Sequence, residues 1–284
     1  MTMTSLLRRA LAACVCLPCL AWSACPPTTR IGLSDLGYAS YRNGEAVEGI
    51  SVDVGRELAR RTGCPVEFVW LPRSRLFLEL AAGHVDLTLG AIRSAERDSY
   101  ASYLPYAYVK FDLVMTRRVA GHYESLADFA ARSQARLNLT RGMQYGMELD
   151  TALSAFKDSG RLEIVNDFDA VFNKIRLGRA DATLATPPIY MHHIKRLPHP
   201  TDIVVLPLSE LRPQFIGLYA SKKSVTAEQL QAYVGALKAM VAERSLPAIY
   251  GKYFDEAMVK EIFRLGPAPL AAALANPEAQ PMRP

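Results

Sequence analysis

From residue 30 onward, the spacing of apolar residues alternates between two periods. Some short runs are almost wholly apolar, as in buried parallel strands. Other segments repeat an apolar residue every three or four positions, as in helices packed on a sheet. The strand-like runs are 31–34, 66–71, 85–89, 111–116, 137–139, 182–185, 203–206 and 215–220. This alternation predicts an α/β fold with doubly wound sheets.

The alternation occurs in two series, about residues 30–89 and about residues 111–206, which predicts two α/β lobes. A strand and a helix follow in the last third of the chain. After Phe263 the chain is rich in Gly, Pro and Ala and has no periodic apolar face. We therefore expect residues 266–284 to form a disordered tail.

The N-terminus has the layout of a secretory signal peptide. Arg8 and Arg9 precede an apolar stretch at 10–22, which ends in small residues near Ser23. The stretch is shorter than the roughly 18 apolar residues that span a bilayer. We expect residues 1–24 to be removed and the mature protein to be periplasmic.

Two cysteines, Cys25 and Cys64, remain after such cleavage. Each precedes a strand-like run, and an even pair in an oxidising compartment favours a disulfide. The alternative is lipidation of Cys25, but Trp22 fits a lipoprotein signal poorly. We therefore predict the disulfide.

Composition excludes several classes of protein. The 284 residues are 50% hydrophobic and 21% charged, with a formal net charge of +5, which favours a globular core over disorder. The sequence has no block of consecutive basic residues that would indicate nucleic-acid binding. It also lacks cofactor motifs and metal-ligand spacing, and we expect His192 and His193 at the surface. We predict neither a cofactor nor a metal.

Six short motifs occur in a characteristic order. They are Gly49–Val54, Gly83–Leu87, Ser94–Arg97, Leu104–Tyr106, Leu177–Ala182 and Ala248–Phe254. Together they resemble the family 3 periplasmic solute-binding proteins over roughly residues 28–256. The resemblance implies a type II binding-protein fold, in which the chain crosses twice between two lobes and the ligand lies in the cleft.

The resemblance also implies where each lobe begins and ends. The crossings are expected near Met115–Arg118 and Arg212–Gly217, and they form a two-strand hinge. Lobe 1 would then hold residues 25–115 and 217–265, and lobe 2 would hold residues 116–216.

Arg97 is the main candidate for ligand binding. It follows Ser94, a predicted helix N-cap, so free N–H groups and a guanidinium would meet at one place, a combination suited to a carboxylate. The resemblance implies that this arginine binds the ligand's α-carboxylate. The alternative is an exposed arginine paired with Glu96 or Asp98.

Further contacts are implied by the resemblance on both sides of the cleft. Backbone N–H groups of Met143, Gln144 and Tyr145 would meet the ligand at another helix N-terminus, with a structural turn as the alternative. Tyr38 would stack on the ligand, with a tyrosine at the rim as the alternative.

Two departures from the family change the expected ligand. Thr186 stands where amino-acid-binding members place the Asp that holds the ligand ammonium, and Gly90 lies in a segment where they have polar residues. Arg73 and Arg93 lie nearby and add positive charge, although Arg73 is equally suited to be a solvated charge at a helix start. These features predict an anion without a conventional α-ammonium group, or an amine that is held otherwise.

We therefore expect a monomeric binding protein that closes on a small carboxylate-bearing solute, either amino-acid-like or an organic anion. It would present the solute to a membrane permease, an ABC importer. One alternative is an enzyme similar to cyclohexadienyl dehydratases, with Glu148 as general acid. Another is a ligand sensor that docks on a membrane receptor.

The predicted disulfide has a measurable effect on stability. A bond between Cys25 and Cys64 would close a loop of about 40 residues and stabilise the fold by about 3–4 kcal/mol, mainly by restricting the unfolded chain. Reductant should therefore lower the melting temperature of the mature protein, and Cys64→Ser should melt at the lower temperature with or without reductant. Two thiols that react with an alkylating agent under non-reducing conditions would contradict the pairing.

Overall fold

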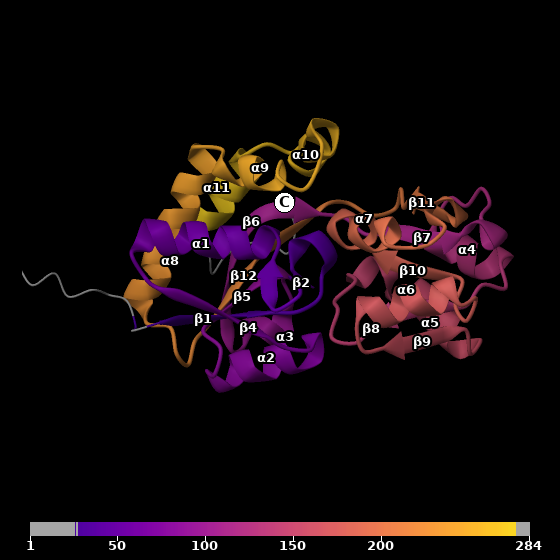
Figure 1. Ribbon diagram of the computed structural model, residues 1–284, viewed down its shortest axis with the longest axis horizontal. Coiled ribbons are helices and arrows are strands. Elements are labelled where there is room, and N and C mark those ends of the chain that lie inside the picture. Colours follow the sequence, from indigo (N-terminus) through magenta and orange to yellow (C-terminus); the bar gives the residue numbers. More distant parts are fainter. Residues whose placement is uncertain (1–25, 27, 277–284) are drawn as a thin grey trace, which may run out of the picture.

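The computed structural model describes residue 26 and residues 28–276. It contains two five-stranded sheets, each flanked by helices, which lie along the long axis of the molecule (Figure 1). The predicted α/β fold of two doubly wound units is confirmed. The predicted signal peptide at 1–24 and Cys25 lie outside the described residues. No helix in the described part of the chain is long and apolar enough to cross a membrane.

The first sheet has the strand order β4-β1-β5-β12-β6. Its first three strands are parallel, whereas β12 runs antiparallel to both of its neighbours. The bounds are β1 Thr29–Leu33, β4 Val66–Trp70, β5 Leu87–Ile92, β6 Ala101–Val109 and β12 Gln214–Ser221.

The second sheet has the order β11-β7-β10-β8-β9. Strands β8, β9 and β10 are parallel, and β7 is antiparallel to β10 and β11. The bounds are β7 Asp112–Thr116, β8 Leu137–Thr140, β9 Leu162–Val165, β10 Ala182–Ala185 and β11 Ile203–Pro207. A separate hairpin joins β2 Tyr41–Asn43 to β3 Ala46–Glu48.

Most helices begin or end at residues suited to these positions. Ser125 and Asp167 accept N-cap hydrogen bonds, Thr226 forms a capping box with Gln229, and Gly63 closes α1 in the left-handed conformation. The α-helices are α1 Ile50–Thr62, α2 Arg73–Ala82, α3 Ala95–Asp98, α4 Leu126–Arg132, α5 Asp150–Asp158, α6 Phe168–Arg176, α7 Pro187–Lys195, α8 Ala227–Ala242, α9 Ser245–Tyr250, α10 Glu256–Ile262 and α11 Ala268–Ala275.

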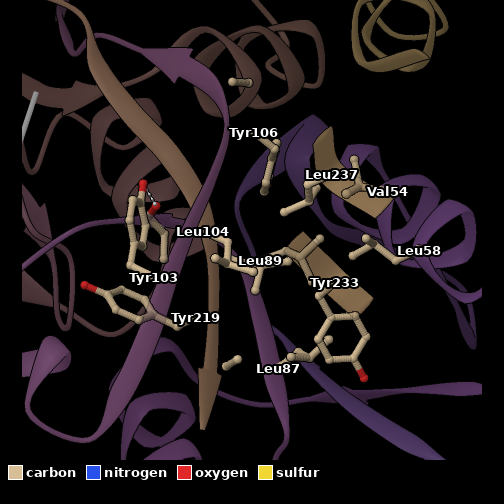
Figure 2. Packing of buried hydrophobic residues seen from close by; sticks show 14 of the residues in the cluster. Val54, Leu58, Leu87, Leu89, Tyr103, Leu104, Tyr106, Tyr219, Tyr233 and Leu237 are labelled. Atoms are coloured by element: carbon tan, nitrogen blue, oxygen red, sulfur yellow. Dashed lines mark hydrogen bonds between the residues drawn. The ribbon is translucent and has the colours of Figure 1, made fainter. Parts of the chain in front are cut away.

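The core of the first unit extends over both faces of its sheet. Figure 2 shows Tyr103 and Tyr219 packed together on one side of the strands, with Leu237 and Tyr233 of α8 on the other side. The buried Tyr103 hydroxyl lies 2.9 Å from the Phe215 carbonyl, so its polar atom is satisfied. These large buried side chains fix β5, β6 and β12, which lead directly to the site described below.

The first predicted crossing between the sheets is wrong in position, and the second, Arg212–Gly217, overlaps the observed crossing but begins several residues too late. Val109 still pairs with Gln214 in the first sheet, and Asp112 already pairs with Ala185 in the second, so the first crossing is residues 110–111 rather than Met115–Arg118. The second crossing is residues 208–213, because β12 begins at Gln214. We call residues 28–109 with 214–276 lobe 1, and residues 112–207 lobe 2.

The predicted disordered tail is also wrong over residues 268–275, which form α11. Leu270 and Leu274 lie one turn apart, are buried, and pack where α11 contacts α8 and β6. The Tyr108 hydroxyl donates a hydrogen bond to the Gly266 carbonyl at 2.6 Å and holds the start of this segment. Two leucines among alanines give only a weak periodic pattern in the sequence, although both leucine side chains are buried in the core. Residues 277–284 lie outside the described residues.

Cys64 is buried and disulfide-bonded. Because Cys25 lies outside the described residues, the pairing of these two cysteines stays a prediction.

The docking of α11 predicts a loss of stability when its contact is removed. Leu274 is 0% exposed, so Leu274→Ala should lower the free energy of unfolding by about 2–4 kcal/mol. Urea unfolding measures the difference. The control Ala271→Ser changes an exposed position of the same helix and should cost less than about 1 kcal/mol. Equal, small effects of both changes would contradict the docking of this helix.

Candidate functional site

A cavity of about 240 Å³ lies between the lobes and is lined by residues of both. One part of its wall consists of the segments at the carboxyl ends of β1, β4 and β5 in lobe 1 and of β8 and β10 in lobe 2. The rest comes from β6, β12, the crossings between the sheets and the helices α9 and α10. Ligands of open α/β sheets bind at the carboxyl ends of the strands. Six of the predicted site residues line the cavity: Arg73, Gly90, Arg97, Met143, Gln144 and Thr186.

Two buried arginines form the polar part of the lobe 1 wall. Arg73 and Arg97 are each 4% exposed, and their guanidinium carbons lie 4.9 and 3.5 Å from the centre of the Phe77 ring. Such cation–π contacts offset part of the cost of burying a guanidinium. No carboxylate in the described ranges forms an ion pair with either arginine.

The two arginines differ in the donors they have left for a ligand. Arg97 donates one Nη to the Ile92 carbonyl at 3.2 Å and the other to the Gly142 carbonyl of lobe 2 at 3.0 Å. Arg73 donates Nη2 to the Gly90 carbonyl at 3.1 Å, while its buried Nε and Nη1 have no hydrogen-bond partner among the described residues. Arg73 therefore offers a larger unused part of its donor fork than Arg97 does.

Burial weakens the preference of both groups for the charged form. Burial, and then the positive charge of Arg97, lower the pKa of Arg73 to about 9. Burial also lowers the pKa of Arg97. Arg73 is still protonated at pH 7, so a cationic donor fork faces the cavity without an ion pair to any described carboxylate. Such an arrangement favours a bound carboxylate or another oxyanion.

Gly90 shapes the backbone beside Arg73. It has φ of +70° within β5, a conformation that glycine adopts without strain. Its N–H donates to the Tyr106 hydroxyl at 3.0 Å while its carbonyl faces Arg73. A Cβ at this position would lie 3.0 Å from the Leu36 side chain. The glycine thus turns a strand carbonyl toward the guanidinium.

The loop after β8 brings lobe 2 onto the arginines. Gly142 has φ of +79°, and a Cβ there would lie 3.0 Å from the backbone of Ser74 in α2. Met143 and Gln144 line the cavity, but Tyr145 does not. The buried Tyr145 hydroxyl accepts a hydrogen bond from the Thr140 N–H at 2.9 Å, so this residue supports the loop.

Ser94, Arg93 and Tyr38 also lie outside the cavity lining. Ser94 caps α3, its hydroxyl accepting from the Arg97 N–H at 3.4 Å. Arg93 forms an ion pair with Asp98 at 2.7 Å. Both residues hold the turn that carries Arg97.

The Tyr38 ring packs within a cluster of aromatic side chains and does not line the cavity. It lies 5.0 Å from the His192 ring and 5.9 Å from the Phe254 ring. The aliphatic residues Leu36, Ala39 and Ile50 form an apolar part of the lobe 1 wall.

The expectation that His192 and His193 lie at the surface is wrong, since both are buried between α7 and its neighbours. His193 stacks on Phe172 at 4.7 Å. Its Nε2 lies 3.5 Å from Asp35 of lobe 1, and its Nδ1 lies 3.5 Å from Asp169 of lobe 2. The three groups lie within 4.8 Å of one another, but the carboxylates face opposite ring nitrogens. This arrangement suits hydrogen bonding across the lobes better than one shared metal ion.

Thr186 is the N-cap residue of α7, and its side chain makes no capping hydrogen bond. Pro187 and Pro188 follow it, so the first two positions of the helix have no N–H to offer. The start of this helix lines the cavity without hydrogen-bond donors at those two positions.

Sequence reasoning missed the polar residues beside the crossings. Lys110, Asp112, Tyr190, Glu261 and Arg264 line the cavity. The sequence predicts the first crossing at Met115–Arg118, so Asp112 falls within the predicted apolar strand 111–116. A charged residue at the start of β7 was the available signal.

Comparison with known proteins identifies related folds. The profile of the bacterial extracellular solute-binding proteins, family 3, matches residues 34–256. A search of curated proteins returned no match.

Solved structures are similar over most of the chain. An ancestral arginine-binding protein bound to arginine has a TM-score of 0.68 and 19% identity, covering 81% of this chain and 99% of its own. A histidine kinase sensor domain with similarity to periplasmic binding proteins has 0.67 and 20%, covering 80% and 96%. The substrate-binding protein of an amino acid ABC transporter has 0.64 and 15%, covering 81% and 100%. At these identities the similarity concerns the fold.

The unpaired charge of Arg73 predicts a gain in stability when it is removed. Arg73→Met should raise the free energy of unfolding of the ligand-free protein at pH 7 by about 1 kcal/mol or more, because a buried guanidinium without an anion is costly. The folded-state pKa is lowered, so this cost is complete below about pH 9. Urea unfolding provides the measurement.

The matched control is Arg75→Met on the same helix. Its side chain is 66% exposed and pairs with Glu79, so the change should be within about 0.5 kcal/mol. A clear loss of stability in Arg73→Met would show that the guanidinium has a structural role instead.

Proposed function

The chain belongs to family 3 of the bacterial extracellular solute-binding proteins, and we propose that it captures a small carboxylate-bearing solute between its lobes. The observation that supports this most directly is the arginine pair. Arg73 and Arg97 are charged, buried and turned toward a cavity in which no described carboxylate pairs with them. A carboxylate of the solute would supply the missing negative charge.

We propose that Arg73 and Arg97 have different parts in binding. Arg73 supplies its free Nε and Nη1 to the solute carboxylate. Arg97 adds its charge and links the lobes through the Gly142 carbonyl. Met143 and Gln144 contact the solute from lobe 2, and Leu36, Ala39 and Ile50 bound its apolar part.

Binding is coupled to closure in this proposal. The contacts of Arg97 with Gly142, of Gly142 with α2, and of His193 with Asp35 all join the lobes. They can exist only when the lobes are together. A solute that touches both lobes favours this closed arrangement by its differential affinity, and residues 110–111 and 208–213 form the hinge.

The proposed partner is the permease of an ABC importer, and the proposed location is the periplasm. The N-terminal signal pattern and the extracellular family support this location. One of the similar folds serves an amino acid ABC transporter. Delivery to a sensor kinase is the second candidate, because another similar fold is a histidine kinase sensor domain.

The dehydratase-like alternative has less support. Glu148, the general acid that it required, is not among the residues lining the cavity. Capture and release through the proposed arginine contacts require no covalent chemistry.

A thermal-shift screen tests the proposal. Amino acids, dicarboxylates and aromatic acids are added to the purified mature protein at several concentrations. A true ligand at 100 times its Kd stabilises the folded state by about 2.7 kcal/mol, which corresponds to a rise in Tm of roughly 5–10 °C. Isothermal titration calorimetry then gives the affinity of each acid that raises the Tm.

Substitutions of the two cavity arginines test whether the ligand-induced rise in Tm depends on them. Arg73→Met and Arg97→Met should each weaken binding by at least 30-fold, because the solute carboxylate loses a buried charged partner. Arg75→Met, exposed on α2, should bind as the wild type does. Unchanged affinity in both cavity variants, or no acid that shifts the Tm, would overturn the proposal.

A further inference from the structure

The interlobe cavity extends from the arginine pair to a helix near the end of the described chain. Helix α10 begins at Glu256, the last residue that the family profile matches. Met258 and Ile262 of this helix line the cavity, and Tyr250 of α9 lines it as well. The features shared with the family therefore do not account for the part of the wall that α10 forms.

Helix α10 contributes one face to the cavity. Met258 and Ile262 are four residues apart, so they lie on the same face of the helix. Both are half-buried and pack against the core of lobe 1. Val259 and Phe263 form the neighbouring pair of positions, pack against the same core and do not line the cavity. The two pairs thus separate contact with the cavity from contact with the core alone.

Two buried tyrosines enlarge the surface that Met258 and Ile262 offer. Tyr108 of β6 and Tyr250 of α9 line the cavity and are 3% and 4% exposed. The Tyr108 hydroxyl is occupied by its hydrogen bond to the Gly266 carbonyl at 2.6 Å. Its ring therefore adds mainly apolar area to this part of the lobe 1 wall.

Three adjacent strands connect this apolar wall to the arginine pair. The Ile92 carbonyl in β5 accepts from Arg97 at 3.2 Å. Ile92 is the register partner of Ile216 in β12, and Ile216 is the partner of Ala107 in β6. Neighbouring strands lie about 4.8 Å apart, so β5 and β6 are about 10 Å apart here, and α10 contacts β6. A solute bound at Arg97 reaches α10 only if its body extends across this distance.

Most polar groups in this part of the lining have partners within the protein. Lys110 donates to a backbone carbonyl at 3.2 Å, and Tyr190 of lobe 2 donates to Asp112. Glu261 and Arg264 pair with each other at 3.2 Å, and both side chains are exposed. The Asp112 Oδ1 atom has no partner among the described residues, and a second acid group of a solute would be repelled there. The lobe 1 side of this region is therefore suited to an apolar group.

We propose that Met258 and Ile262 form a specificity wall for a solute with a long apolar body behind its acid group. The acid group binds at the arginine pair, and the body extends along lobe 1 past Ile92 and Ile216 to α10. This inference rests on the proposed function and refines it, because it separates acids with a long apolar body from short acids and dicarboxylates. It concerns the end of the solute away from the acid group, so it applies to amino acids and simple acids alike.

The test uses two series of straight-chain acids that differ only in length. One series is butyrate, hexanoate and octanoate, and the other has the same chains with a 2-amino group. Titration calorimetry of the mature protein gives the affinity of each acid. Each buried methylene should tighten binding about two- to fourfold. In the series that binds more tightly, the longest acid should therefore exceed the shortest by at least about tenfold.

Two substitutions on α10 test whether the helix contacts the longer chains. Met258→Gln and Ile262→Thr each place a polar atom in the apolar wall with little change in side-chain size. The longest acid should bind at least about fivefold more weakly to each variant, because its chain then meets a polar group. The shortest acid should bind within about twofold of its wild-type affinity, because its chain ends before α10.

Val259→Thr is the matched control on the same helix. It exchanges a β-branched apolar residue for threonine at a half-buried position outside the cavity lining. The affinity of every acid should stay within about twofold, although the melting temperature falls. A loss for the longest acid equal to that in Ile262→Thr would overturn the direct contact and indicate a general effect on the packing of α10.

The outcomes distinguish this inference from the proposed function. Acids that bind with no dependence on chain length would overturn the specificity wall and leave carboxylate capture intact. A dependence on length that Met258→Gln and Ile262→Thr leave unchanged would overturn it as well. Failure of every acid to bind, whatever its length, would overturn the proposed function itself.

Discussion

Two guanidinium groups share one phenylalanine ring inside the protein without a protein carboxylate in contact with them in the described chain. Buried like charges lower the stability of a fold, and they persist only where the surrounding structure is stable enough to hold them. The large core of lobe 1, with its buried tyrosines on both sides of β5 and β6, provides that stability. The remaining features of the site depend on this unbalanced charge.

The protein itself offsets only part of the free-energy cost of burying the two guanidinium groups. Phe77 of lobe 1 lies against both guanidinium groups. The Gly90 carbonyl accepts from Arg73, whereas the Ile92 carbonyl of lobe 1 and the Gly142 carbonyl of lobe 2 accept from Arg97. Carbonyl dipoles reduce the cost of burial but cannot neutralise a charge. In the proposed function an acidic solute would complete the balance, and because its contacts would come from two lobes, the event that neutralises the arginines would also favour the closed arrangement.

The periodicity of apolar residues predicts most of the fold, but it predicts less of the candidate site. Buried runs such as Ala182–Ala185 and the helical stripe from Phe168 to Ile175 have patterns that few other structures produce. The motif containing Arg97 led to one arginine of the pair. Asp112 is missed because only two residues separate β6 from β7, so the predicted strand-like run 111–116 includes it, although the charges of Lys110 and Asp112 mark the change of sheet. The contact between Arg73 and the Gly90 carbonyl depends on how α2 packs beside β5, and the spacing of residues along the chain does not predict it.

The two prolines at the start of α7 make the two ends of the cavity chemically different. The peptide dipoles of that helix create a positive potential at its start, yet the first two positions carry no hydrogen that could anchor an oxygen. An acid group at this end of the cavity would find no N–H at the first two helical positions, whereas at the arginine pair it would find charged donors. For the proposed solute, the difference between the two ends would favour one orientation in the cavity, with the acid group toward the arginines.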